Sequence, residues 1–126
     1  MDRAPAQFAA GLPTQKNGGR RADFSRPVDD DKRDLARRYA RLVVGCRKFA
    51  AAASFAARHK DAFEEMSAYL QRYNEDVIKE LRTGDPIRRA VAESQLQFCS
   101  ELTALLFSEE EAELLRRRGR VAQGAT

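Results

Sequence analysis

Apolar side chains recur at alternating steps of four and three residues through the first half of the chain. The run consists of Leu35, Tyr39, Leu42, Cys46, Phe49, Ala53 and Ala56. This heptad spacing is typical of a helix that packs along another helix, and it does not fit the alternation of a β-strand. A second stripe with helical spacing follows at Phe63, Met66, Leu70, Tyr73, Val77 and Leu81.

The two stripes are expected to belong to one long helix from Asp29 to Arg82. This stretch contains no proline, its only glycine is Gly45, and an alanine-rich segment joins the stripes. Alanine is the strongest helix former, so nothing local favours an end between the stripes. Three aspartates, 29–31, open the helix, where acidic groups oppose the positive end of its dipole. At 1.5 Å per residue such a helix is roughly 80 Å long.

A tight turn is predicted next, with Gly84 as the left-handed residue that ends the long helix. Asp85 and Pro86 are the usual first residues of a new helix, and so short a connection implies an antiparallel neighbour. The second helix is expected to run from Pro86 to about Phe107. Ser108 then begins a capping box that restarts the helix as far as Gly119. The predicted fold is therefore an all-α helical hairpin with a bent C-terminal end.

The two helices of this hairpin differ in length. Pairing back from the turn, the second helix covers only about residues 50–82, and the heptad between Leu35 and Phe49 has no partner. Leaving apolar surface in water costs roughly 25 cal/mol per Å². The stripe is therefore expected to self-associate or to dock on another protein. The alternative is a break near Arg58 that folds the chain back into a three-helix bundle.

Three regions are distinguished by composition. Residues 1–27 are basic and repeatedly interrupted by glycine and proline, which predicts a flexible N-terminal arm. Its two isolated aromatics, Phe8 and Phe24, are either incidental or anchors for a partner. Residues 28–119 form the helical hairpin or coiled-coil domain, and residues 120–126 are expected to be a flexible tail.

Positive charge is concentrated in the first half of the predicted long helix. The net charge is +4, and residues 28–60 carry nine basic against four acidic side chains. Four basic residues lie near one helical face and form a candidate anion-binding surface: Arg33, Arg37, Arg41 and Lys48. Such a row can follow a phosphate backbone, so a nucleic-acid-binding or nucleoprotein-assembly factor is the alternative function. No recognition motif accompanies the row.

Catalytic, cofactor and metal sites are not predicted. The chain has one histidine, His59, which is expected on the surface, and two cysteines, Cys46 and Cys99, which do not have metal-ligand spacing. The cysteines are expected to be free thiols on helix seams, which favours a reducing, intracellular compartment. No apolar run reaches the length of a membrane-spanning helix.

The sequence therefore favours a non-catalytic helical subunit or adaptor of a larger assembly. The expected protein-binding residues are Leu35, Tyr39, Leu42, Cys46 and Phe49, together with the N-terminal arm. The expected partner is another protein or a second copy of the chain, with nucleic acid as the less favoured partner.

Overall fold

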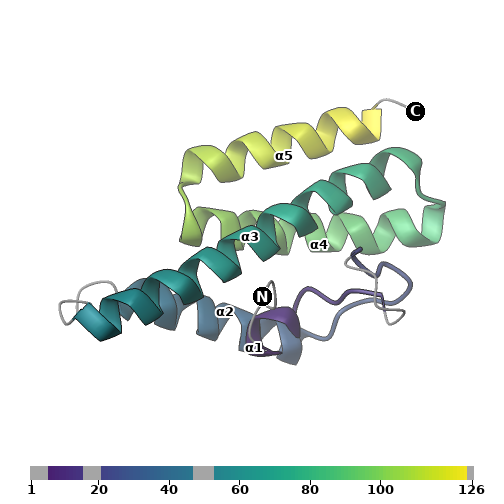
Figure 1. The fold of residues 1–126 in the computed structure, drawn as a ribbon. Helices are drawn as coiled ribbons and strands as arrows, with labels where there is room; N and C mark the ends of the chain where they lie inside the picture. The colour runs from purple at the N-terminus through teal and green to yellow at the C-terminus, as the bar shows by residue number, and fades with distance from the viewer. Residues whose placement is uncertain (1–5, 16–20, 47–52, 125–126) are drawn as a thin grey trace.

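Five helices pack against one another in the described part of the chain (Figure 1). The computed structural model describes residues 6–15, 21–46 and 53–124, and for 53–57 only the course of the helix. The helices are α1 (Ala6–Ala9), α2 (Asp30–Gly45), α3 (Ala53–Thr83), α4 (Pro86–Leu106) and α5 (Glu109–Gly124). The predicted all-α class is confirmed.

The antiparallel pair of α3 and α4 is the predicted hairpin. The Asp85 side chain accepts a hydrogen bond from the backbone N–H of Arg88 (2.9 Å), and Pro86 stands in the first turn, as expected. The left-handed conformation expected for Gly84 is wrong, because its φ lies outside that region. A glycine suits this position for another reason, since a Cβ there would lie 2.6 Å from the carbonyl oxygen of Glu80.

The single helix expected from Asp29 to Arg82 is not present. α2 ends at Gly45, α3 begins at Ala53, and the ring of His59 donates to the carbonyl of Val43 over 2.7 Å. Within one helix these residues would be about 24 Å apart, so α2 folds back beside α3. The alternative prediction of a fold-back is closer, but its break near Arg58 is also wrong, because Arg58 lies inside α3.

The start of α5 agrees with the predicted capping box, whereas its end differs from the prediction. The Ser108 hydroxyl accepts the backbone N–H of Glu111 (3.1 Å), which confirms this hydrogen bond of the predicted capping box. The helix does not stop at Gly119 but continues to Gly124. Gly119 is buried, and a Cβ there would lie 2.4 Å from Leu96 Cδ2. This glycine therefore permits close packing of α5 on α4 and does not end the helix.

The described part of the N-terminal arm belongs to the bundle. Its chain reverses direction, so that Thr14 and Ala22 form an antiparallel β-bridge. Both isolated aromatics, Phe8 and Phe24, are buried in the common core, at 0% and 2% exposure. The arm is also tied by polar bonds, since Tyr69 on α3 donates to the carbonyl of Leu12 (2.6 Å). Phe8 and Phe24 are thus core residues and not anchors for a partner.

One hydrophobic core connects these elements, and it includes a buried polar group. In Figure 1 α3 crosses the molecule in front of α4, with α5 above this pair and with α1 and α2 toward the lower side. Gln95 of α4 has no exposed surface, accepts from Arg33, and donates to the carbonyl of Gly11 and the hydroxyl of Tyr73. Arm, α2, α3 and α4 therefore meet at one hydrogen-bonded amide, where burial raises the pKa of the Tyr73 phenol.

Candidate functional site

The inner face of α2 consists of small side chains. Ala36, Ala40 and Val43 are buried against the rest of the bundle, at 0%, 0% and 7% exposure. Their spacing of four and three residues places them on one side of the helix. Because alanine has so short a side chain, α2 can lie close to its neighbours without a large residue between them.

The outer face of α2 carries the large apolar residues instead. Leu35 and Leu42 are 43% and 64% exposed, so two leucines of the predicted seam do not contribute to the core. They are seven residues apart, which puts them on the same side of the helix and about 10 Å from each other. A helix that buries alanines and exposes leucines has apolar side chains that the described part of the chain does not cover.

The other described seam residues, Tyr39 and Cys46, are less exposed than the two leucines. Tyr39 is half-buried, and its ring centroid lies 6.5 Å from that of Phe8 in the arm. Cys46 is a half-buried free thiol directly after α2, and Phe49 lies outside the described residues. Of the predicted binding residues, Leu35 and Leu42 are therefore exposed, whereas Tyr39 is half-buried beside Phe8 of the arm.

Two of the predicted basic residues are engaged inside the protein. Arg33 donates to Gln95 Oε1 (2.6 Å) and Ser94 Oγ (2.8 Å), and Arg37 pairs with Asp34 and with Glu101 of α4. The hydrogen bond to Glu101 raises the pKa of the Arg37 guanidinium.

Both guanidinium groups also lie over the ring of Phe98, at 5.7 and 5.3 Å from its centroid. Arg33 and Arg37 thus fasten α2 to α4. Of the other two predicted anion-binding residues, Arg41 is exposed and Lys48 lies outside the described residues.

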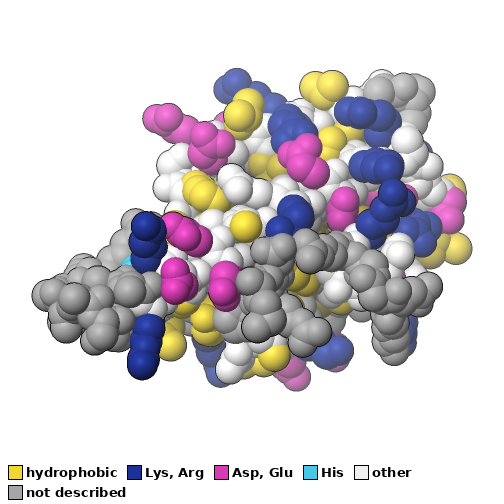
Figure 2. All heavy atoms as spheres, in the orientation of Figure 1, with side chains coloured by type: hydrophobic (Ala, Val, Ile, Leu, Met, Phe, Trp, Pro, Cys, Tyr) yellow, Lys and Arg dark blue, Asp and Glu magenta, His cyan; other side chains and the backbone are white. Residues whose placement is uncertain are grey.

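The exposed face of α2 has charges of both signs. We call the residues Asp31, Asp34, Leu35, Arg38, Arg41 and Leu42, all of them exposed, the outer face of α2. Its acidic pair lies toward the N-terminus of the helix and its basic pair toward the C-terminus, with the leucines interspersed. Figure 2 likewise shows Lys and Arg side chains interspersed with Asp and Glu over the face of the molecule that it presents.

The histidine and the two cysteines of the chain were the candidates for catalytic or metal-binding roles. His59 is partly exposed, and its ring also lies against Phe63 and bonds to the carbonyl of Val43. Cys46 and Cys99 are both free, as predicted. Cys99 is fully buried, and this burial raises the pKa of its thiol.

Among the described residues there is neither a candidate metal site nor a candidate membrane-spanning helix. No group of three or more His, Cys, Asp or Glu side chains is placed to hold a metal ion. No helix in the described ranges combines the length and the apolar character needed to cross a membrane.

The hydrophobic pattern of the sequence did not predict the buried hydrogen bonds of Gln95. Gln95 is a polar residue that sequence reasoning left unassigned, yet it lies between Val91 and Cys99 on the apolar stripe of α4. A polar residue at a stripe position is the one signal that marks it as buried.

Comparison of the chain with protein-family models, with curated proteins and with solved structures gave no match.

Proposed function

We propose that this protein is a non-catalytic helical subunit that joins a larger assembly through the outer face of α2. The observation that carries the proposal is the inverted distribution of side chains on α2, with alanines inward and Leu35 and Leu42 outward. Burying one leucine fully is worth about 1.5–3 kcal/mol. The arm is not part of the proposed surface, because Phe8 and Phe24 are already buried within the chain.

The occupant that suits this surface is another amphipathic helix. Two leucines one heptad apart present the knobs that a facing helix accepts between its own side chains. A second copy of α2 in antiparallel orientation also matches the charges. Leu35 of one copy then faces Leu42 of the other, and Asp34 comes close to Arg41 of the other copy. Two-fold symmetry makes each contact twice.

The association is expected to be weak. Burying Leu35 and Leu42 of both copies contributes a few kcal/mol of binding free energy. Association itself costs about 4–15 kcal/mol in lost translational and rotational freedom. The self-associated form is therefore expected at high protein concentration, or within an assembly that adds further contacts.

Sedimentation velocity over a concentration series tests the proposal. The wild type is expected to show a monomer–dimer equilibrium, and the double variant Leu35→Gln/Leu42→Gln is expected to remain monomeric. Ile87→Gln is the matched control, because Ile87 is an exposed apolar residue on α4, at 75% exposure. Glutamine keeps good helix propensity, so the melting temperatures of the variants are expected to stay close to that of the wild type.

Two results would contradict the proposal. The first is a wild type that remains monomeric at millimolar concentration. The second is a dimer that persists in the double variant. Binding to DNA or RNA that weakens steeply with salt and requires Arg38 and Arg41 would instead favour the nucleic-acid hypothesis.

A further inference from the structure

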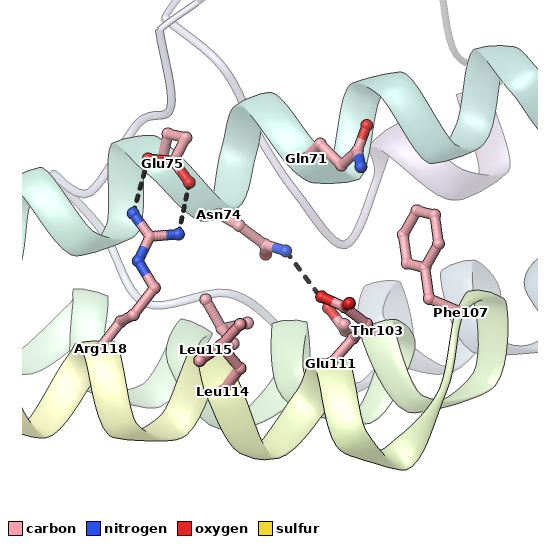
Figure 3. A pocket seen from close by; sticks show the side chains of 9 residues that line it. All are labelled: Gln71, Asn74, Glu75, Thr103, Phe107, Glu111, Leu114, Leu115 and Arg118. Atoms are coloured by element: carbon pink, nitrogen blue, oxygen red, sulfur yellow. Dashed lines mark hydrogen bonds and ion pairs between the residues drawn. The ribbon is translucent and has the colours of Figure 1, made fainter.

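An open pocket of about 360 Å³ lies between α3, the end of α4 and α5 (Figure 3). Its volume falls at the lower end of the range for small-molecule sites. Phe107 and Leu114 form its apolar walls and are 39% and 51% exposed, while Leu115 is buried below them. This pocket is separate from the outer face of α2.

The packing of α5 explains why the pocket exists. α5 lies close to α4 because its buried face contains Ala112, Gly119 and Ala122, and Leu96 of α4 fits against the glycine. On the side toward α3, Arg118 reaches across the gap and makes two hydrogen bonds to Glu75, of 2.6 and 2.7 Å. Figure 3 shows this pair at one end of the pocket and the Phe107 ring at the other.

The floor of the pocket contains a buried acceptor that has no partner. Asn74 is 7% exposed, and its Nδ2 donates to Thr103 Oγ1 over 3.2 Å. The Thr103 hydroxyl gives its own hydrogen to the carbonyl of Cys99 (2.7 Å), so toward Asn74 it can only accept. This fixes the orientation of the amide and leaves Asn74 Oδ1 buried without a donor among the described groups.

These features define the kind of ligand that fits. Oδ1 requires an N–H or O–H donor, and the walls require an apolar body of modest size. The donor is best neutral, because Asn74 and Thr103 carry no charge and a buried cation would be left without a counter-charge. Of the two carboxylates that line the pocket, Glu75 is already paired with Arg118, and Glu111 is exposed to water, which screens its charge.

We propose that the pocket binds a neutral ring compound that carries a single hydrogen-bond donor, of the indole or phenol type. The ring lies between Phe107 and Leu114, and the donor bonds to Asn74 Oδ1. Because Oδ1 is buried, the side chains that cover it move aside as the ligand enters, while Asn74 Nδ2 keeps its hydrogen bond to Thr103.

Paired ligands test the hydrogen bond directly. Indole and 1-methylindole have nearly the same apolar body, but only indole has an N–H donor. Titration of the ¹⁵N- and ¹³C-labelled protein is expected to give saturable indole binding, with shifts at the Asn74 side-chain amide and the Leu115 methyl groups. 1-Methylindole is expected to bind about tenfold more weakly, since it leaves a buried acceptor unpaired.

Substitutions separate the contribution of the Asn74 acceptor from that of the apolar walls. Asn74→Leu is expected to remove the preference for indole, so that both ligands bind with similar affinity. Phe107→Ala is expected to weaken the binding of both ligands and to keep the preference for indole, and it changes a side chain that is 39% exposed. Ile87→Ala is the control away from the pocket, with unchanged binding. Equal binding of the two ligands to the wild type, binding without a shift at Asn74, or no binding of either ligand at millimolar concentration would overturn the proposal.

Discussion

Gly11 is the point at which the arm touches the inner face of the bundle, and it provides a sharp test of the packing. A Cβ at this position would lie 2.8 Å from Ala36 Cβ, 3.0 Å from Phe98 Cε2 and 3.3 Å from Arg33 Cα. Two of these three atoms are a backbone carbon and a methyl group fixed directly to one, so they cannot move aside as the end of a long side chain can. The substitution Gly11→Ala therefore forces the arm away from α2.

The expected cost follows from two opposing effects. Overpacking of a well-packed core costs typically 1–3 kcal/mol. Replacing glycine by alanine also restricts the unfolded chain, which returns about 0.4–1 kcal/mol. The net destabilisation is therefore about 1–2 kcal/mol. With a urea m-value of about 1–3 kcal/mol per molar, the unfolding midpoint is expected to fall by about 0.3–2 M.

The assay is urea unfolding followed by circular dichroism at 222 nm, with Gly45→Ala as the matched control. A Cβ at Gly45 meets nothing within 4 Å, and Gly45 is the last residue of α2. Alanine there is expected to leave stability unchanged or to raise it by up to about 1 kcal/mol. An unchanged or higher midpoint for Gly11→Ala would show that the arm does not pack against α2 at this distance.

Three further predictions concern local contacts. The hydrogen bond from Arg118 lowers the pKa of Glu75, so this pair contributes stability above about pH 4 that is lost as the pH falls through the lowered pKa. Acid titration of Glu75→Gln is expected to show a smaller loss than the wild type, by less than about 1 kcal/mol because the pair is exposed. A thiol reagent is expected to label Cys46 in the native protein and to reach Cys99 only on unfolding, and early labelling of both would contradict the buried position of Cys99. Gly84→Val is expected to lower the melting temperature, since its Cβ would contact the carbonyl oxygen one turn earlier, and an unchanged value would show that this contact is absent.

The hairpin was predictable because its signals are local. Asp85 and Pro86 begin α4 by their own chemistry, and the antiparallel turn then fixes the pairing of α3 and α4. The hydrogen bond between Gln95 and Tyr73 lies close to the register obtained by counting back from the turn. Ser108 likewise begins α5 through a bond to a backbone group three residues away.

The end of α2 was not predictable from the same kind of signal. Helix propensity favours continuation through the alanines, and the stretch from Asp29 to Arg82 has one glycine and no proline. The fold-back is stabilised by groups distant in sequence, such as the pairing of Arg37 with Glu101 and the stacking of Arg33 and Arg37 on Phe98. A charge row on one helix cannot reveal that acidic and aromatic partners exist on another.

The binding role of the heptad stays a prediction. Its spacing places Leu35 and Leu42 on one face, where both are exposed, but the same spacing includes Tyr39, which is half-buried beside Phe8 of the arm. Phe8 is one aromatic in a polar segment, and a single residue has no periodicity from which its burial can be inferred. The sequence therefore shows the spacing of a stripe, while the packing of other segments determines which of its residues remain exposed.

The central claim, that α2 pairs with a second helix through its outer face, is tested most directly by a cysteine placed midway between the two leucines. In an antiparallel pair of α2 helices, position 38 lies next to the two-fold axis, so Arg38→Cys in a Cys46→Ser background brings two thiols together. Mild oxidation is expected to give a covalent dimer rapidly, and it captures a weak complex. Gln97→Cys, at an exposed position of α4, is expected to remain monomeric under the same conditions. Equal cross-linking of the two variants, or none at position 38, would contradict the proposed interface.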